Sequence, residues 1–102
     1  MTPLRLWQSG EYDADFEVVL EADGRFSVER GSYVTGGRRY GTLTSRQQAD
    51  LERLIAAVDL EAEYPVVETS RSVLEVGDEA VTWSGAPPVA GLRALMEALV
   101  RL

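Results

Sequence analysis

The segment FEVVLEADGRFSVER, residues 16–30, decides the fold, because apolar side chains alternate with polar and charged ones on both sides of a central Asp-Gly pair. Phe16, Val18 and Leu20 precede the pair, and Phe26 and Val28 follow it. Alternation with a period of two places each set of side chains on one face of a sheet. We therefore expect two antiparallel strands joined by a tight turn at residues 21–26.

The geometry of this turn follows from the requirement that the apolar side chains share a face. A two-residue loop would place Leu20 opposite Ser27 and break the apolar face. A type I turn with Gly24 in the left-handed conformation, as a G1 bulge, pairs Glu21 with Arg25 instead. The resulting cross-strand pairs are Leu20 with Phe26, Val18 with Val28 and Glu17 with Glu29.

Upstream, the alternation continues through GEYDADFEV, residues 10–18, and places four carboxylates on the polar face. They are Glu11, Asp13, Asp15 and Glu17. An EF-hand calcium loop would need Gly and Glu where this sequence has Val18 and Gly24. Alternate side chains of a strand also lie about 6–7 Å apart, too far for three of them to hold one ion. We therefore expect no metal site here.

Two interpretations of the carboxylate row stay open. It is either the solvated face of a strand or an acidic face that docks a basic partner. Like charges along one strand repel one another, and Glu17 opposite Glu29 lowers the stability of the sheet. These costs favour a docking role, since a row of one sign of charge steers a basic partner and raises its association rate.

The N-terminal half contains two further strand patterns. LRLWQS, residues 4–9, alternates as a first strand. Gly36-Gly37 marks a two-residue turn that sets Tyr33 opposite Tyr40, before a fourth strand at residues 38–43.

TSRQQADLERLIAAVDL, residues 44–60, predicts a helix with an apolar stripe. Thr44 and Gln47 have the spacing of a capping box at its start. The segment that follows the helix contains Pro65, which lacks a backbone donor, so any strand there lies at a sheet edge.

SVLEVGDEAVTWSG, residues 72–85, predicts a second hairpin with a two-residue turn at Gly77-Asp78, and Pro87-Pro88 opens a last helix. The inward side chains of this helix are expected to be Val89, Leu92, Leu95, Met96 and Leu99. The element order is β-β-β-β-α-β-β-α. We expect a single α+β domain over residues 1–102, with an antiparallel sheet of about five to six strands and two helices packed on one face.

The composition excludes several chemistries. The 102 residues include no Cys and no His, which removes disulfides, the usual zinc, haem and iron–sulfur sites and every His-based triad. The net charge of −7 makes nucleic acid and anionic membranes poor partners. We expect a soluble, cytoplasmic protein without a cofactor. Every positively charged side chain is Arg. Lys and Asn are both absent, which indicates a GC-rich bacterial genome.

Four other side chains are candidates for partner contact. Trp7 shares a face with Arg5 if Leu4 and Leu6 point inward, and an outward Trp beside an acidic strand marks an interface. Arg38, Arg39 and Tyr40 follow the Gly pair, and Arg with Tyr is the composition of binding hot spots. This segment is either a plain hairpin or a contact loop. Trp83, in contrast, falls on the predicted core face.

The element order resembles that of the emfourin-like family, whose namesake inhibits protealysin, a thermolysin-type metalloprotease, and that of related small bacterial domains of unknown function. The similar segments are ADGRFSVERG (22–31), GTLTSRQQADLERLIAAVDL (41–60), VLEVGDEAVTWSGAPP (73–88) and LRALMEALVRL (92–102). The resemblance covers almost the whole chain and implies a non-enzymatic binder of a protease. None of the residues is assigned an inhibitory role through it.

We expect a small acidic protein-binding module rather than an enzyme, with a peptidase as the partner that the resemblance implies. Its contact surface is predicted to combine the row from Glu11 to Glu17, the segment 38–40 and Trp7. The alternative is a structural protein that forms a homodimer through its sheet edges. Weakening of binding by salt favours the first hypothesis, and a concentration-dependent mass without a partner favours the second.

Overall fold

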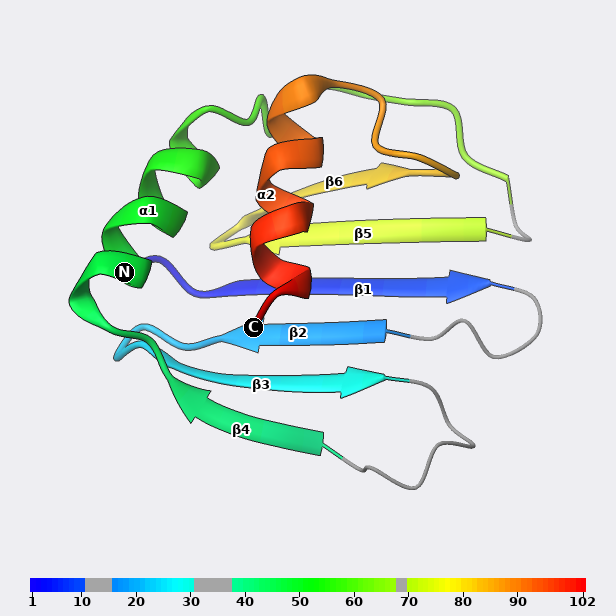
Figure 1. Cartoon of the computed structure of the whole chain (residues 1–102). Coiled ribbons are helices and arrows are strands. Elements are labelled where there is room, and N and C mark those ends of the chain that lie inside the picture. The colour runs from blue at the N-terminus through cyan, green and yellow to red at the C-terminus, as the bar shows by residue number, and fades with distance from the viewer. Residues whose placement is uncertain (11–15, 31–37, 68–69) are drawn as a thin grey trace.

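The computed structural model describes residues 1–10, 16–30, 38–67 and 70–102, which form one antiparallel sheet and two helices (Figure 1). The elements are β1 (Leu4–Gly10), β2 (Phe16–Leu20), β3 (Arg25–Arg30), β4 (Arg38–Thr42), α1 (Ser45–Ala56), β5 (Ser70–Val76), β6 (Glu79–Trp83) and α2 (Ala90–Val100). The six strands lie in the order β4-β3-β2-β1-β5-β6. The predicted fold class and element order are confirmed.

The first hairpin has the predicted turn and register. The Glu21 N–H donates to the Arg25 carbonyl at 2.9 Å, and the Gly24 N–H donates to the Glu21 carbonyl at 2.9 Å. Gly24 has a φ of +91°, a conformation that glycine adopts without steric cost. The observed pairs are Leu20 with Phe26, Val18 with Val28 and Glu17 with Glu29.

β1 lies at the centre of the sheet between β2 and β5, so the two predicted hairpins share one core (Figure 1). Leu6 pairs with Val18 on one side and with Leu74 on the other, and its side chain is fully buried. The β5–β6 register is also as predicted and sets Ser72 opposite Trp83. Trp83 is 1% exposed, which confirms its place in the core.

α1 begins as predicted and ends four residues earlier. The Gln47 N–H donates to Thr44 Oγ1 at 3.1 Å, and the Thr44 N–H donates to Gln47 Oε1 at 2.8 Å, so both bonds of the capping box are present. The last helical residue is Ala56, not residue 60. Asp59 accepts the Glu61 N–H at 3.0 Å, a local bond that replaces helical hydrogen bonding.

α2 starts later than predicted. Val89 is the N-cap residue with φ −136° and ψ 156°, and it is 42% exposed, so its predicted inward position is wrong. The physical reason is that a cap residue is extended and does not follow the helical repeat. Leu92, Leu95 and Leu99 are buried as expected, and Met96 packs against the same core.

The register of β4 differs from the prediction. Tyr40 pairs with Ser27, not with Tyr33, and Arg38 pairs with Glu29. Gly41 lies directly against the ring of Phe26, its cross-strand partner, and this close contact fits only a residue without a side chain. Residues 31–37, including Tyr33 and the Gly36-Gly37 pair, lie outside the described residues.

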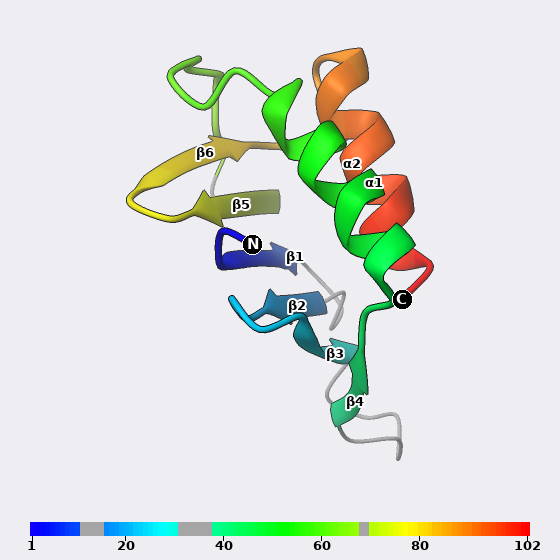
Figure 2. The ribbon, with the colours of Figure 1, turned by 90° about the vertical axis from the view of Figure 1, so that its left-hand side faces the viewer.

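Both helices cover the same face of the sheet, as Figure 2 shows from the side. The strand residues that face them form the core with the apolar side chains of α1 and α2. Among the described residues, neither helix lies over the opposite face of the sheet (Figure 2), which we call the uncovered face. This uncovered face carries the candidate site.

Replacing Gly41 with Ala tests the β3–β4 packing. A Cβ at this position would lie 2.4 Å from Phe26 Cζ and 2.7 Å from Phe26 Cε1. The ring has to move out of its contact with the core, so we expect a loss of about 1–3 kcal/mol in the free energy of unfolding. Urea denaturation followed by Trp fluorescence measures it.

The neighbouring substitution Thr42→Ala is the control and should change stability by no more than about 0.5–1 kcal/mol. Gly→Ala raises stability where the backbone and the surroundings accept a methyl group. A Gly41→Ala variant at least as stable as the wild type would therefore contradict the packing described here.

Candidate functional site

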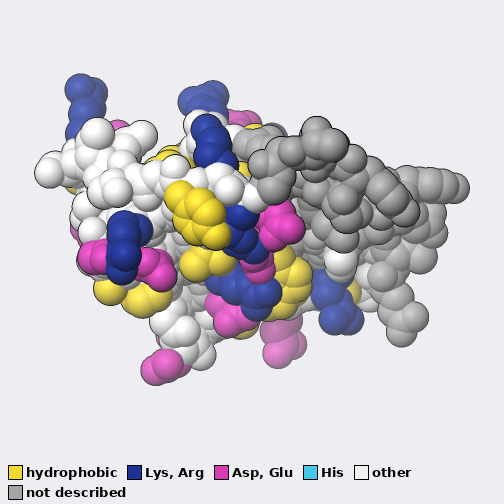
Figure 3. Space-filling model, turned by 90° about the horizontal axis from the view of Figure 1, so that it is seen from below, with side chains coloured by type: hydrophobic (Ala, Val, Ile, Leu, Met, Phe, Trp, Pro, Cys, Tyr) yellow, Lys and Arg dark blue, Asp and Glu magenta, His cyan; other side chains and the backbone are white. Residues whose placement is uncertain are grey.

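The alternation of the strands directs one set of side chains away from the helices, onto the uncovered face. This set includes Arg5 and Trp7 from β1, Glu17 and Val19 from β2, Arg25, Ser27 and Glu29 from β3, Arg38 and Tyr40 from β4, and Val73 and Glu75 from β5. In the view from the side of β4, basic and acidic side chains are interleaved with apolar ones (Figure 3). The described side chains of the uncovered face therefore include both signs of charge and apolar groups.

Glu17 is the centre of an ion-pair network on the uncovered face. Arg5 binds one carboxylate oxygen of Glu17 through Nε at 2.8 Å and Nη2 at 2.7 Å. Arg38 donates to the other oxygen of Glu17 and, through the same nitrogen, to Glu29 Oε2 at 2.6 Å. Arg38 Nη1 also donates to Ser27 Oγ at 2.9 Å. The network therefore joins four strands, β1 to β4, through side chains.

The network resolves the repulsion expected between Glu17 and Glu29. The two carboxylates face each other across the hairpin, as predicted. Arg38 lies between them and binds both. Hydrogen bonds between ionised groups are stronger than neutral ones, so a pair that lowers stability alone becomes part of a stabilising cluster.

The two arginines lower the pKa of Glu17. The hydrogen bond from Arg38 is the largest cause that lowers the pKa of Glu17 from its ordinary value, partial burial opposes the shift, and Arg5 adds to it. The same bond raises the pKa of Arg38. Glu17 is therefore ionised throughout the physiological range, and it holds both arginines in place.

Two aromatic side chains flank the network. The guanidinium carbon of Arg5 lies 4.2 Å from the centroid of the Trp7 ring, a cation–π geometry. Tyr40 is 75% exposed on β4, two residues along the strand from Arg38. Arg, Trp and Tyr are the residues most enriched among binding hot spots.

The structure brings together some of the predicted contact residues and separates others. Trp7, Glu17, Arg38 and Tyr40 share the uncovered face. Arg39 pairs with Val28, whose side chain is in the core, so Arg39 points to the helix side of β4. Residues 38–40 belong to a strand and not to a hairpin tip. Glu11, Asp13 and Asp15 lie outside the described residues.

Arg5 and Glu29 belong to the site, although neither is among the contact residues predicted from the sequence. The signal for Arg5 was its outward position beside Trp7. The pairing of β1 with β2 is not evident from the hydrophobic pattern. It sets Arg5 opposite Val19 and two pairs along the ladder from Glu17, on the same face. Glu29 was recognised only as a like charge opposite Glu17, since the cation that joins them comes from β4.

In the described part of the chain, no group of three or more Asp or Glu side chains is arranged to hold a metal ion. Neither of its helices is long and apolar enough to span a lipid bilayer. The site as described offers charge, hydrogen bonding and aromatic surface.

Comparison with known proteins gives one partial similarity. No family model matches the chain. The chain is 37% identical over 76 residues to a protein named microbial collagenase from Vibrio parahaemolyticus serotype O3:K6 (strain RIMD 2210633). The match covers 66% of this chain and 9% of the collagenase. The chain thus corresponds to a small part of that relative.

The lowered pKa of Glu17 predicts a specific pH dependence of stability. A carboxylate whose pKa is lowered in the folded state contributes stability that is complete above its unfolded pKa, near its ordinary value of 4.5, and is lost as the pH falls through the folded pKa. The variant Glu17→Gln should therefore be less stable than the wild type at pH 7, by about 1 kcal/mol, and the difference should shrink as the pH falls below 4.5.

Urea denaturation at a series of pH values measures this difference. Glu97→Gln removes an exposed carboxylate from α2, away from the network, and serves as the control. A difference between the wild type and Glu17→Gln that stays constant from pH 7 into the acid range would contradict the assignment of the shift to the network.

Proposed function

We propose that this chain is a non-enzymatic protein-binding module, that the uncovered face of its sheet is the contact surface, and that its partner is a peptidase. One observation supports the choice of this face as the contact surface. Arg5 and Arg38 are held by Glu17 on the face without helices, with Trp7 and Tyr40 beside them. The arrangement gathers hot-spot residue types on one face of the sheet, from β1 to the edge strand β4.

Preorganisation supports this use of the face. Immobilising a long side chain on binding costs roughly 0.5–1.5 kcal/mol. Arg5 is already fixed by two bonds to Glu17 and by the Trp7 ring, and Arg38 by bonds to three side chains. A partner that meets these side chains therefore orders fewer of them than it would on a surface of free arginines.

The choice of a peptidase rests on two likenesses. The resemblance to the emfourin-like family implies inhibition of a thermolysin-type metalloprotease, and the partial similarity is to a protein named as a collagenase. The chain itself has no histidine, so it cannot carry the H-E-x-x-H zinc motif of such peptidases. A non-catalytic role toward a peptidase is consistent with all three facts.

The second candidate is a homodimer through a sheet edge. β4 lies at one edge of the sheet, contains no proline, and carries Arg39 and Tyr40 as exposed side chains. An edge strand presents unpaired backbone groups to a second chain, and a two-fold axis would pair β4 with its own copy. This candidate predicts association without any other protein.

An inhibition assay with matched variants tests the first candidate. The wild-type chain is titrated against thermolysin and against a microbial collagenase with a fluorogenic peptide substrate. We expect inhibition of at least one enzyme and a loss of about tenfold or more in affinity for Tyr40→Ser, since a hot-spot side chain contributes about 2 kcal/mol or more.

Val100→Ser is the control, because it removes an apolar side chain that is 41% exposed on α2, on the helix side of the sheet. It should inhibit like the wild type. Absence of inhibition by the wild type, or an equal loss for both variants, would count against the uncovered face as an inhibitory surface. Sedimentation equilibrium on the chain alone decides whether it is a dimer.

A further inference from the structure

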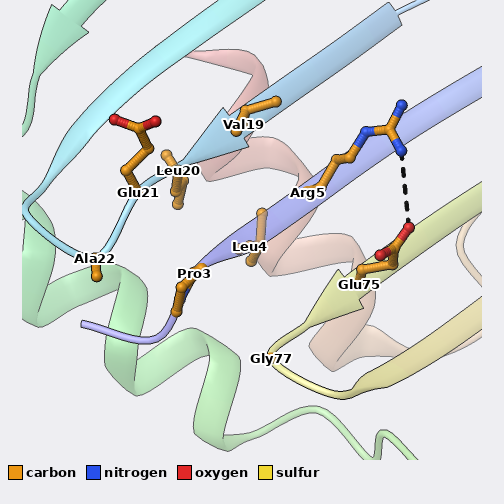
Figure 4. A pocket seen from close by; sticks show the side chains of 9 residues that line it. All are labelled: Pro3, Leu4, Arg5, Val19, Leu20, Glu21, Ala22, Glu75 and Gly77. Carbon is orange, nitrogen blue, oxygen red and sulfur yellow. Dashed lines mark ion pairs between the residues drawn. The ribbon is translucent and has the colours of Figure 1, made fainter.

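Two hollows lie next to each other on the uncovered face. One, of about 290 Å³, is lined by Pro3, Arg5, Val19, Glu21 and Glu75 among others, and Figure 4 shows these side chains around it. The second, of about 260 Å³, is lined by Val19, Glu21, Arg25, Phe26, Ser27 and Tyr40. They share Val19 and Glu21, so the two hollows meet at these side chains, and we call the pair the groove.

The register of the sheet explains the direction of the groove. Tyr40 pairs with Ser27, Ser27 with Val19, Val19 with Arg5, and Arg5 with Glu75. These residues form a row that crosses five strands, and the short side chains of Ser27 and Val19 leave its middle low. Neighbouring strands lie about 4.8 Å apart, so the groove is about 19 Å long. An extended segment of about six residues covers that length.

The charges that line the groove are not equally paired. Arg5 is bound to Glu17 at 2.7 Å, and it reaches Glu75 only at 3.8 Å. Arg25 is bound to Asp23 at 2.7 Å and to Glu21 at 3.4 Å. Of the carboxylates that line the groove, Glu75 therefore has the longest distance to its cation. Asp78, in the turn that follows β5, adds an exposed carboxylate nearby. This end of the groove favours a positive charge.

We propose that the groove holds an extended segment of the partner protein and that an Arg or Lys side chain of this segment pairs with Glu75. The aliphatic stem of that side chain lies over Val19 and Pro3, and its cation replaces the long contact between Arg5 and Glu75. Arg5 keeps its bonds to Glu17 throughout. This inference rests on the proposed function, because it assigns the partner's anchor to the same uncovered face.

The test uses the uniformly ¹⁵N-labelled full chain and two synthetic peptides at low ionic strength. One is the hexapeptide acetyl-Ala-Leu-Arg-Ala-Leu-Ala-amide, and the other has citrulline in place of arginine, which keeps the shape and removes the charge. We expect the arginine peptide at millimolar concentration to shift the amide signals of Val19, Glu21 and Glu75, and the citrulline peptide to bind about tenfold more weakly.

Two variants make the result specific. Glu75→Gln should weaken binding of the arginine peptide by roughly fivefold to tenfold, and Glu97→Gln on α2 should leave it unchanged. Equal binding of both peptides, or equal effects of both variants, would overturn the pairing with Glu75. Signals that shift only along β4 would indicate strand addition at the sheet edge and would also overturn it.

The outcomes separate this inference from the proposed function. Peptidase inhibition that depends on Tyr40, without any shift in the groove on addition of the arginine peptide, would overturn the groove assignment and leave the binding module standing. Shifts that grow with the concentration of the chain alone would assign the groove to a second copy, against our proposal. Failure of both the inhibition assay and the peptide titration would remove both proposals.

Discussion

The left-handed conformation of Gly24 is the constraint on which the rest of the structure depends. It allows the bulged turn that sets Leu20 opposite Phe26, and a shift of one residue would move every side chain of β2 to the other face. β1 pairs with β2 in a register that continues the same sorting, and β5 pairs with β1. The buried leucines and valines of these strands therefore face the helices, and Arg5, Glu17 and Glu29 lie on the uncovered face.

The register of β2 and β3 places two like charges opposite each other, and a cation from β4 compensates for their repulsion. Glu17 and Glu29 meet on the uncovered face as soon as β2 and β3 pair. Arg38 reaches both in the observed register of β4, in which Gly41 lies against the ring of Phe26. Packing on the helix side thus fixes the charges on the other side, and the same arrangement leaves Arg5 and Arg38 ordered beside Trp7 and Tyr40. The binding surface that we propose is a consequence of the core.

Local patterns in the sequence predicted both hairpins, the capping box and the face of Trp7, because each depends on residues within about ten positions. The register of β4 was not predictable in this way, since it sets Gly41 against the ring of Phe26, a contact between strands that no turn motif indicates. Because residues 38–42 form a strand, Arg38 and Arg39 point to opposite faces of the sheet. The role of Arg5 depends on the pairing of β1 with β2, which the hydrophobic pattern alone does not specify.

A double-mutant cycle between Glu17 and Arg38 tests the central claim most directly. The free energy of unfolding is measured for the wild type, Glu17→Gln, Arg38→Gln and the double variant at low and high salt. The two side chains meet only if β2, β3 and β4 have the register described, so we expect a coupling energy of about 0.5–1 kcal/mol that decreases with salt. Strictly additive effects at low salt would contradict the network and the sorting that builds it.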